Sequence, residues 1–542
     1  MKIRYVFILY LLSLLFMGLF HIATTPIFEG FDENAHYSYI RQIAYQGKIS
    51  KRSENFLDQA VVDYQGPISY SSGQPPFNRG MVYHKFFNRH DLVDSYITQN
   101  RQNTPPTSFS PSLIENWQSQ HPPLYYALMA PILKLVDVEP LVTQIFILRS
   151  LSYVLALVGV ALGVMSIMQR KLTGIYTQNA PLLLGFVIYP IMLPMFFPEF
   201  ARIGNDSLCV LLVGLLAYLL SKLLAVGGGI KLSLAIGVTL GLGLLTKAFF
   251  IPIAAAMFMF FLVKFFACRF ADEKVINKTS GLLWIFLPAI AIGGTWYAYN
   301  YLILGGFSGS NVAIELAHKG GGGLTNMIST FSLPIFSRAV ATSLVTFVWG
   351  GTWSLTHLPH ALYVPVVIGI IWIFGAFCYQ LRKIPLSDTH WLTVWLVIFF
   401  LIGFSWHAIV SMMLGGNANT PGWYLHILLP FFAPAVGVGV EFVSRKSKYK
   451  FLFLGLLTYS LIFYFAAVWS QLALFSGCAI KGNDKQYEFQ SELFCFDHFP
   501  QMINHLDLLG YPLAGLIGFL GWVVCSVLLV ISLRKYLAIA RV

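Results

Sequence analysis

Residues 5–20 read YVFILYLLSLLFMGLF, an uncharged apolar run that directly follows the basic residues Lys2 and Arg4. Such a run belongs either to a signal peptide or to a membrane span, and no small-x-small cleavage site follows at residues 21–26. We therefore interpret residues 4–24 as a retained first transmembrane helix. The whole chain is similarly apolar, since 57% of its 542 residues are hydrophobic, 11% are charged and the mean hydropathy is +0.68. These values are typical of a polytopic membrane protein.

The hydropathy pattern predicts an all-α protein with about twelve transmembrane helices of about 20 residues each. The predicted spans are residues 4–24, 143–168, 178–198, 207–225, 231–246, 248–266, 280–302, 361–381, 391–413, 424–443, 450–474 and 511–533. Short basic loops at Arg170-Lys171, Arg382-Lys383 and residues 445–450 are typical of cytoplasmic loops, so both termini are expected inside. Because Lys and Arg are dispersed among the spans, the net charge of +12 reflects topology and does not indicate a nucleic-acid partner.

This topology leaves long exterior segments at about residues 25–142, 303–360 and 475–510, and no separate soluble domain, so residues 1–542 are expected to form a single membrane domain. In the first segment, residues 37–45 and 121–136 have the pattern of amphipathic helices lying along the membrane interface. In the last segment, Cys478 and Cys495 share one exterior loop. An oxidising compartment would allow a disulfide between them, and two unpaired thiols are the alternative.

Ionisable side chains crowd one position just outside the first span, where residues 31–37 read Phe-Asp-Glu-Asn-Ala-His-Tyr. If this run is helical, Asp32, Glu33 and His36 lie near one face, because positions three and four apart are neighbours. Carboxylates are rare in so apolar a chain, which indicates a functional site. The three side chains could also hold a metal ion, but no further ligands are visible nearby, so we predict no metal site. A divalent cation is neither required nor excluded.

Lys247 interrupts an apolar stretch that we interpret as a helical hairpin with arms at residues 231–246 and 248–266. One long helix would instead move the basic cluster at residues 264–278 outside, against the charge rule. Arms this short reach roughly 24 Å, less than a hydrocarbon core of roughly 30 Å, so the ammonium of Lys247 should lie recessed below the outer surface. A recessed ammonium needs an anion or a water-filled cavity. Snorkelling to lipid headgroups is the alternative.

Five short motifs occur in an order that resembles the GT-C superfamily of glycosyltransferases, which take sugars from polyprenyl-phosphate carriers at the outer membrane face. They are Glu29-Gly-Phe-Asp32-Glu33-Asn-Ala-His36, His121-Pro-Pro-Leu-Tyr125-Tyr126, Ala201-Arg202-Ile-Gly-Asn205-Asp206, Leu245-Thr246-Lys247 and Gly422-Trp423-Tyr424-Leu425. The resemblance is to bacterial members of unassigned specificity, similar to aminoarabinose transferases and protein O-mannosyltransferases. It implies a bacterial inner-membrane enzyme with its active site on the periplasmic or external side.

The resemblance also implies roles for individual residues. Asp32, with Glu33 beside it, is the candidate base for the acceptor hydroxyl, and the sequence does not order the two. Lys247, Arg202 and Arg149 are candidates for binding the donor phosphate, although ordinary interfacial or helix-pairing roles are equally open for the arginines. The candidates for supporting roles are His36, His121, Tyr125, Asp206, Tyr424 and His426. Many relatives carry arginine where this chain has Trp423, and His426 is the nearby residue that would partly replace it.

We therefore expect an inverting transferase that moves a sugar from a polyprenyl-phosphate donor to a glycan, lipid or protein acceptor; the identities of sugar and acceptor are not readable from the sequence. A lipid-linked glycan flippase is one alternative, but transporters usually have midplane sites and internal repeats, and we find no convincing repeat. An O-antigen ligase or polymerase is another, but its large exterior loop usually comes late in the chain, whereas here the larger loop comes first. A helicase-like Asp-Glu-x-x-His match lacks any accompanying phosphate-binding loop.

Overall fold

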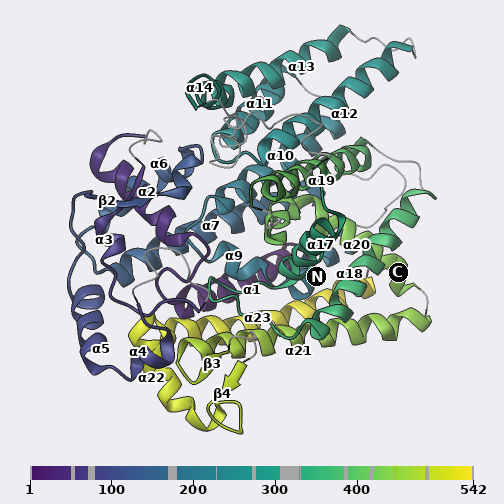
Figure 1. Ribbon diagram of the computed structural model, residues 1–542. Helices are drawn as coiled ribbons and strands as arrows, with labels where there is room; N and C mark the ends of the chain where they lie inside the picture. Colours follow the sequence, from purple (N-terminus) through teal and green to yellow (C-terminus); the bar gives the residue numbers. More distant parts are fainter. Residues whose placement is uncertain are drawn as a thin grey trace.

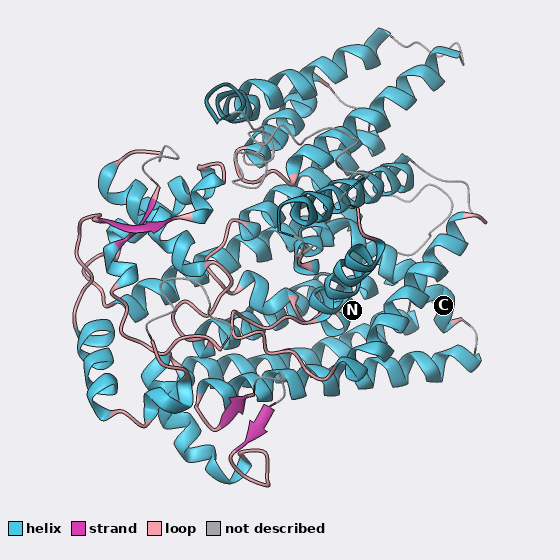
Figure 2. Cartoon of the chain, viewed as in Figure 1, coloured by secondary structure: helices cyan, strands magenta, loops and turns pink. Residues whose placement is uncertain are grey.

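The computed structural model describes residues 3–49, 55–70, 80–168, 180–226, 229–270, 276–304, 329, 331–383, 388–415, 420–445, 447–482 and 487–539. These residues form an all-α membrane protein, as predicted, with two short antiparallel strand pairs (Figure 2). Strand β1 (Phe56–Asp58) pairs with β2 (Pro111–Glu115), and β3 (Ala479–Lys481) pairs with β4 (Tyr487–Phe489). The predicted cytoplasmic loop at Arg170-Lys171 lies outside the described residues.

Each of the twelve predicted spans overlaps a helix. These helices are α1 (Ile3–Thr24), α7 (Leu141–Met168), α8 (Ala180–Met192), α10 (Asp206–Val226), α11 (Ile230–Leu244), α12 (Phe250–Phe270), α13 (Ile276–Ala289) continued by α14 (Thr295–Leu304), α18 (His360–Leu381), α19 (Asp388–Gly415), α20 (Leu429–Ser444), α21 (Ser447–Phe475) and α23 (Pro512–Ile539). A π-helical turn, η5 (Ile290–Gly294), joins α13 to α14. Within the described residues, nine helices are long and apolar enough to cross a membrane, and α8, α11 and α12 count among the shorter apolar helices.

The remaining helices lie between these spans. They are α2 (Glu33–Gln46), α3 (Gln59–Val62), α4 (Tyr83–Phe87), α5 (His90–Tyr96), η3 (Ile97–Gln102), η4 (Trp117–Gln120), α6 (Leu124–Leu135), α9 (Phe196–Phe200), α17 (Leu333–Val348), η6 (Gly422–Leu428), η7 (Phe496–His498) and α22 (Phe499–Leu509). Helices α2 and α6 overlap residues 37–45 and 121–136, the two segments for which the sequence predicts amphipathic helices. Helix α17 was not predicted; it falls in the expected exterior segment at 303–360, of which residues 305–328 and 330 lie outside the described part.

The long helices run side by side, and the elements of the first exterior segment gather at one end of them (Figure 1). Helix α1 packs along α23, and α7 packs along α10. The α7–α10 contact depends on small residues, because a Cβ on Gly214 would lie 2.1 Å from the carbonyl oxygen of Gly159. Elements α2 to α6, the β3–β4 pair and α22 therefore share one end of the bundle, while α1 begins and α23 ends toward the other.

Two features bring distant segments to this end. The chain turns between α11 and α12, so that Lys247 lies in a hairpin turn as the sequence predicts. Helix α10 begins at Asp206, directly after a bend at residues 201–205 that follows α9. Cys478 and Cys495, also at this end, are joined by a disulfide. The start of α2, the bend before α10, the turn at Lys247 and the disulfide therefore lie at the same end of the bundle.

Candidate functional site

The segment that leads into α2 has an unusual backbone. Phe28 and Asp32 both have positive φ angles, 62° and 58°, a left-handed conformation that L-residues adopt at a cost. Between them, Gly30 passes so close to Arg202 that a Cβ on Gly30 would lie 2.6 Å from the Arg202 Cβ. Glycine is therefore needed at this position. The turn brings Asp32, at the start of α2, close to the bend at residues 201–205.

Asp32 has a half-buried carboxylate that accepts a short hydrogen bond from an indole. The indole Nε1–H of Trp117 donates to Asp32 Oδ1 over 2.8 Å. Burial raises the pKa of Asp32, although the Trp117 hydrogen bond and the charges of Arg202 and Lys247 act in the opposite direction. The described part of the chain contains no salt bridge to Asp32. Its carboxylate is thus near two cations without being paired to either, and it keeps part of its surface accessible.

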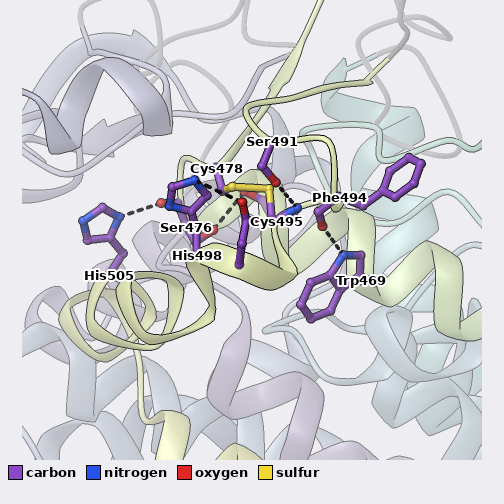
Figure 3. The surroundings of a disulfide bond; sticks show 10 residues. Trp469, Ser476, Cys478, Ser491, Phe494, Cys495, His498 and His505 are labelled. Atoms are coloured by element: carbon purple, nitrogen blue, oxygen red, sulfur yellow. Dashed lines mark hydrogen bonds and ion pairs between the residues drawn. A yellow bond between two sulfur atoms is a disulfide. The ribbon is translucent and has the colours of Figure 1, made fainter.

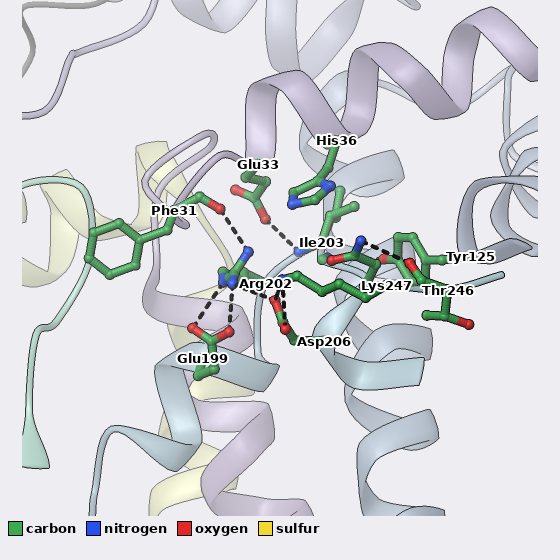
Figure 4. Close-up of polar contacts among 12 residues, drawn as sticks. Phe31, Glu33, His36, Tyr125, Glu199, Arg202, Ile203, Asp206, Thr246 and Lys247 are labelled. Carbon is green, nitrogen blue, oxygen red and sulfur yellow. Dashed lines mark hydrogen bonds and ion pairs between the residues drawn. The ribbon is translucent and has the colours of Figure 1, made fainter. Parts of the chain in front are cut away.

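Arg202 connects the segment before α2 to two acidic residues (Figure 4). Its guanidinium donates to Glu199 Oε1 over 2.6 Å and to Asp206 Oδ2 over 3.2 Å. It also donates to the carbonyl oxygen of Phe31 over 2.7 Å, directly before Asp32 in the chain. Arg202 is buried, and a buried guanidinium is stabilised when its donors are satisfied in this way. The arginine therefore fixes the backbone at Asp32 while contributing a positive charge beside it.

Lys247 is buried and paired with Asp206. Its Nζ lies 2.8 Å from both carboxylate oxygens of Asp206 and is 4.6 Å and 4.7 Å from the ring centroids of Phe249 and Tyr424. The sequence predicted a recessed ammonium that needs an anion or a cavity, and the structure supplies Asp206 as the anion. Figure 4 shows Asp206 between the side chains of Arg202 and Lys247. Tyr424 contributes an aromatic face, which attracts a cation electrostatically.

Glu33 and Arg149 form a separate buried ion pair. Arg149 Nε donates to Glu33 Oε1 over 2.7 Å, and Nη2 donates to Glu33 Oε2, a bidentate arrangement. Oε1 of Glu33 also accepts the backbone N–H of Ile203. The remaining donors of Arg149 are directed to the carbonyl oxygens of Ile22, Thr25 and Pro26. Both side chains are thus fully occupied with each other and with the backbone, and they tie α7 to the end of α1 and the start of α2.

Two histidines and two tyrosines line the side of the site nearest α6. His36 Nδ1 lies 2.9 Å from the hydroxyl of Tyr126, and the His36 ring stacks on that of His121 with centroids 6.4 Å apart. Burial lowers the pKa of His121 to about 3 and that of His36 well below its ordinary value, so both rings are neutral near pH 7. Tyr125 accepts the backbone N–H of Gly204 and contacts Ser152. It therefore supports the bend before Asp206.

His426 lies apart from the charged network. Its Nδ1 is 3.1 Å from the Tyr189 hydroxyl, and its Nε2 is 3.1 Å from the Phe347 carbonyl oxygen, so both ring nitrogens are engaged in the core. Trp423, by contrast, stacks on Phe31 with ring centroids 4.1 Å apart. The Gly-Trp-Tyr-Leu motif thus reaches the site through Trp423 and Tyr424.

Glu199 and Trp117 belong to the site, and neither was among the residues proposed from the sequence. Glu199 precedes Arg202 by three positions, a helical spacing that could have indicated the pair. Trp117 lies 85 positions after Asp32, and nothing in the local sequence connects the two. Within the described residues, no group of three or more His, Cys, Asp or Glu side chains has an arrangement that could hold a metal ion. Asp32 supplies a carboxylate that can accept a proton. Arg202 and Lys247 supply cations beside it, and both are paired with Asp206.

No family model matches the chain, and no curated protein matches it. Among solved structures, it is similar to ArnT from Cupriavidus metallidurans bound to undecaprenyl phosphate, with a TM-score of 0.38 and 11% identity over 86% of this chain and 74% of that one. The apo state of that ArnT gives a TM-score of 0.37 and 13% identity over 80% of this chain and 74% of the other. A TM-score below 0.5 does not assign an activity, so the activity depends on what this chain's own residues can do.

Proposed function

We propose that this chain is a GT-C membrane glycosyltransferase that transfers a sugar from a polyprenyl-phosphate donor to a hydroxyl-bearing acceptor, with Asp32 as the base. The observation that carries the proposal is the placement of the half-buried carboxylate of Asp32 beside two buried cations, Arg202 and Lys247. In the reaction, the acceptor oxygen attacks the anomeric carbon, Asp32 takes the acceptor's proton, and the bond from that carbon to the phosphate oxygen breaks. A single displacement of this kind inverts the anomeric configuration.

The contacts favour Asp32 over Glu33 as the base. Both oxygens of Glu33 are engaged by the Arg149 guanidinium, and Oε1 also accepts from Ile203. A carboxylate held in this way has little free capacity to accept a proton from a substrate. Asp32 instead accepts from the Trp117 indole and takes part in no salt bridge of the described residues, and its raised pKa makes it a better proton acceptor than an ordinary aspartate.

Lys247 and Arg202 are the residues that we assign to the donor phosphate, because the leaving phosphate gains negative charge that cations stabilise. Arg149 is a weaker candidate than the sequence suggested, because its guanidinium is paired with Glu33, whereas Arg202 and Lys247 are the cations whose charges act on Asp32. The Lys247 ammonium has two hydrogen bonds to Asp206 in the structure. An incoming phosphate would share or replace these contacts with Asp206, the counterion of Lys247.

The location of the site on the external face of the inner membrane is part of the proposal. The basic loops predict cytoplasmic termini. The disulfide between Cys478 and Cys495 lies at the same end of the bundle as Asp32, and disulfides persist in oxidising compartments such as the periplasm. Both observations support a periplasmic or external active site.

Release of polyprenyl phosphate tests the proposal. Purified full-length protein in lipid nanodiscs would be incubated with a panel of undecaprenyl-phosphate sugars and an envelope-glycan extract as acceptor. Asp32→Asn is expected to lower turnover by about 10²- to 10⁴-fold, the usual contribution of general base catalysis, without changing the melting temperature. Asp63→Asn, at an exposed aspartate of the same exterior segment, is the matched control. Full turnover by the Asp32→Asn protein would contradict the assignment of the base.

A further inference from the structure

The disulfide-closed segment at residues 478–495 and the residues just after it expose an unusual amount of apolar surface. The large side chains that face outward there are Leu493 (61% exposed), Phe494 (59%), Phe496 (62%), Phe499 (50%) and Ile503 (40%). The segment lies at the edge of the bundle beside α21, on the side away from the other long helices (Figure 1). Exposed patches of this kind mark interaction surfaces.

The backbone of this segment is held in a costly conformation. Phe494 and Cys495 are consecutive non-glycine residues with positive φ angles, 50° and 70°. Such a conformation persists only where surrounding contacts fix it. Here the contacts are the disulfide to Cys478, a hydrogen bond from the Cys495 N–H to Ser491 Oγ, and a hydrogen bond from the Trp469 indole to the Phe494 carbonyl oxygen (Figure 3). The strained turn keeps the phenylalanine side chains on the outside.

Trp469 gives the depth of the segment relative to the membrane. It belongs to the membrane-spanning part of α21, six residues before the helix ends at Phe475, which is about 9 Å along the axis at 1.5 Å per residue. The Trp469 ring stacks on Phe496, with centroids 4.2 Å apart, and on Phe499 at 6.4 Å. The segment therefore folds back along the side of α21, beside the outer part of its membrane span.

The exposed surface is continuous with the lipid-facing surface of α21. Ile462, seven positions before Trp469 and so on the same face, is 62% exposed within the predicted span, and Phe465 between them is 38% exposed. The ring of Phe465 packs edge-on against Phe519 and Trp522 of α23 and keeps part of its surface open. Ile462 and Phe465 thus leave apolar surface on this face of α21, which we expect to face the hydrocarbon of the bilayer. Phe494, Phe496 and Phe499 extend the same stripe toward the headgroups, where aromatic residues are enriched.

We propose that residues 493–503 form an interfacial anchor that inserts Phe494, Phe496 and Phe499 into the lipid leaflet on the Asp32 side of the membrane. The partner is the lipid bilayer itself. The disulfide and Trp469 hold the turn in the conformation that inserts these rings, and the anchor thereby fixes the outer ends of α21 and α23 at the membrane surface. This inference does not depend on the proposed enzymatic activity.

Photo-crosslinking in vesicles tests the anchor. Full-length protein with Phe494 replaced by photoreactive benzoyl-phenylalanine would be reconstituted into vesicles of phosphatidylethanolamine and phosphatidylglycerol, illuminated and analysed by mass spectrometry for lipid adducts. Replacement of Phe496 provides a second position. Asp91, an exposed residue of α5 that is paired with Arg89, is the matched control. Gel filtration before reconstitution confirms that each protein is folded.

We expect lipid adducts at positions 494 and 496 to exceed those at position 91 by about tenfold or more. Apolar rings that the protein leaves exposed gain free energy when they enter the leaflet, whereas a charged position stays in water. Adduct yields equal to those at position 91 would overturn the proposal. Protein–protein adducts in place of lipid adducts would also overturn it, because they would assign the surface to contact with a second copy of the chain.

Discussion

The ammonium of Lys247 lies 2.8 Å from both carboxylate oxygens of Asp206, and both side chains are buried. The same carboxylate also accepts from Arg202. Asp206 thus neutralises part of the positive charge of Lys247 and Arg202, the two cations that we propose bind the donor phosphate. In a buried ion pair, removal of one partner leaves the other charge uncompensated, and this is usually more costly than removal of both.

Lys247 and Asp206 are therefore expected to be strongly coupled in stability. Lys247→Met and Asp206→Asn should each lower the free energy of unfolding by about 3–5 kcal/mol, whereas the double variant should lose clearly less than the sum. Thermal unfolding in detergent measures all three. The exposed pair of Arg89 and Asp91 provides the control, since its removal should change stability little. Additive losses at Lys247 and Asp206 would show that the two charges do not depend on each other.

The pH dependence of turnover should report the pKa of Asp32. A base must be deprotonated to act, so turnover should rise with pH through the pKa of Asp32, at a higher pH than for an ordinary aspartate because burial raises this pKa. Trp117→Phe removes a hydrogen bond that stabilises the carboxylate, so it should raise the pKa further and move the acidic limb to higher pH. His36 and His121 have lowered pKa values and should not titrate there. An unmoved limb in the Trp117→Phe profile would argue against Asp32.

We expect Glu33 to contribute to stability and Asp32 to contribute to turnover. Glu33→Gln removes the charge that compensates buried Arg149, so the protein should lose about 3–5 kcal/mol of stability. Below its melting temperature, however, the variant should keep turnover within about tenfold of the wild type, because Asp32 remains. Turnover and thermal unfolding measured on the same preparation separate the two effects. If Glu33→Gln is instead folded, stable and inactive, Glu33 is the base.

Glu29 should position Asp32 through the backbone. Its buried carboxylate accepts from the hydroxyls of Tyr83, Thr352 and Ser354, and from the Ser354 N–H, and no salt bridge to it occurs in the described part of the chain. These bonds hold the segment between the two left-handed residues, Phe28 and Asp32. Burial raises the pKa of Glu29.

Loss of this contact should lower kcat and leave KM nearly unchanged. Misplacement of a catalytic group by about 1 Å costs about 10²-fold in rate, and Glu29→Ala should approach that value. Ser354→Ala removes one of the hydroxyl donors and should have a smaller effect of the same kind. Steady-state kinetics on folded protein measures both. Equal kcat in Glu29→Ala and wild type would show that the Asp32 turn holds without this carboxylate.

Much of the architecture was predictable from the sequence because membrane spans are a local property. The absence of water in the bilayer requires long apolar helices, and each predicted span overlaps a helix. The turn at Lys247 between two helices was likewise predictable, because a single long helix would have conflicted with the charge rule. Helix α17 was missed because it lies within a segment interpreted as an exterior loop, where its apolar residues were not counted as a span.

The chain's order of residues by itself determined the membrane class, the position of the helices and the crowding of Asp32, Glu33 and His36 outside the first span. Tertiary structure decided what each charge does. Glu33 and Asp32 are neighbours in sequence, yet Glu33 is paired with Arg149 from α7 while Asp32 receives Trp117 and faces Arg202 and Lys247. Hydrogen bonds and charge–charge interactions act over a few ångströms in space, and these partners lie 85 to 215 positions from Asp32 or Glu33 along the chain.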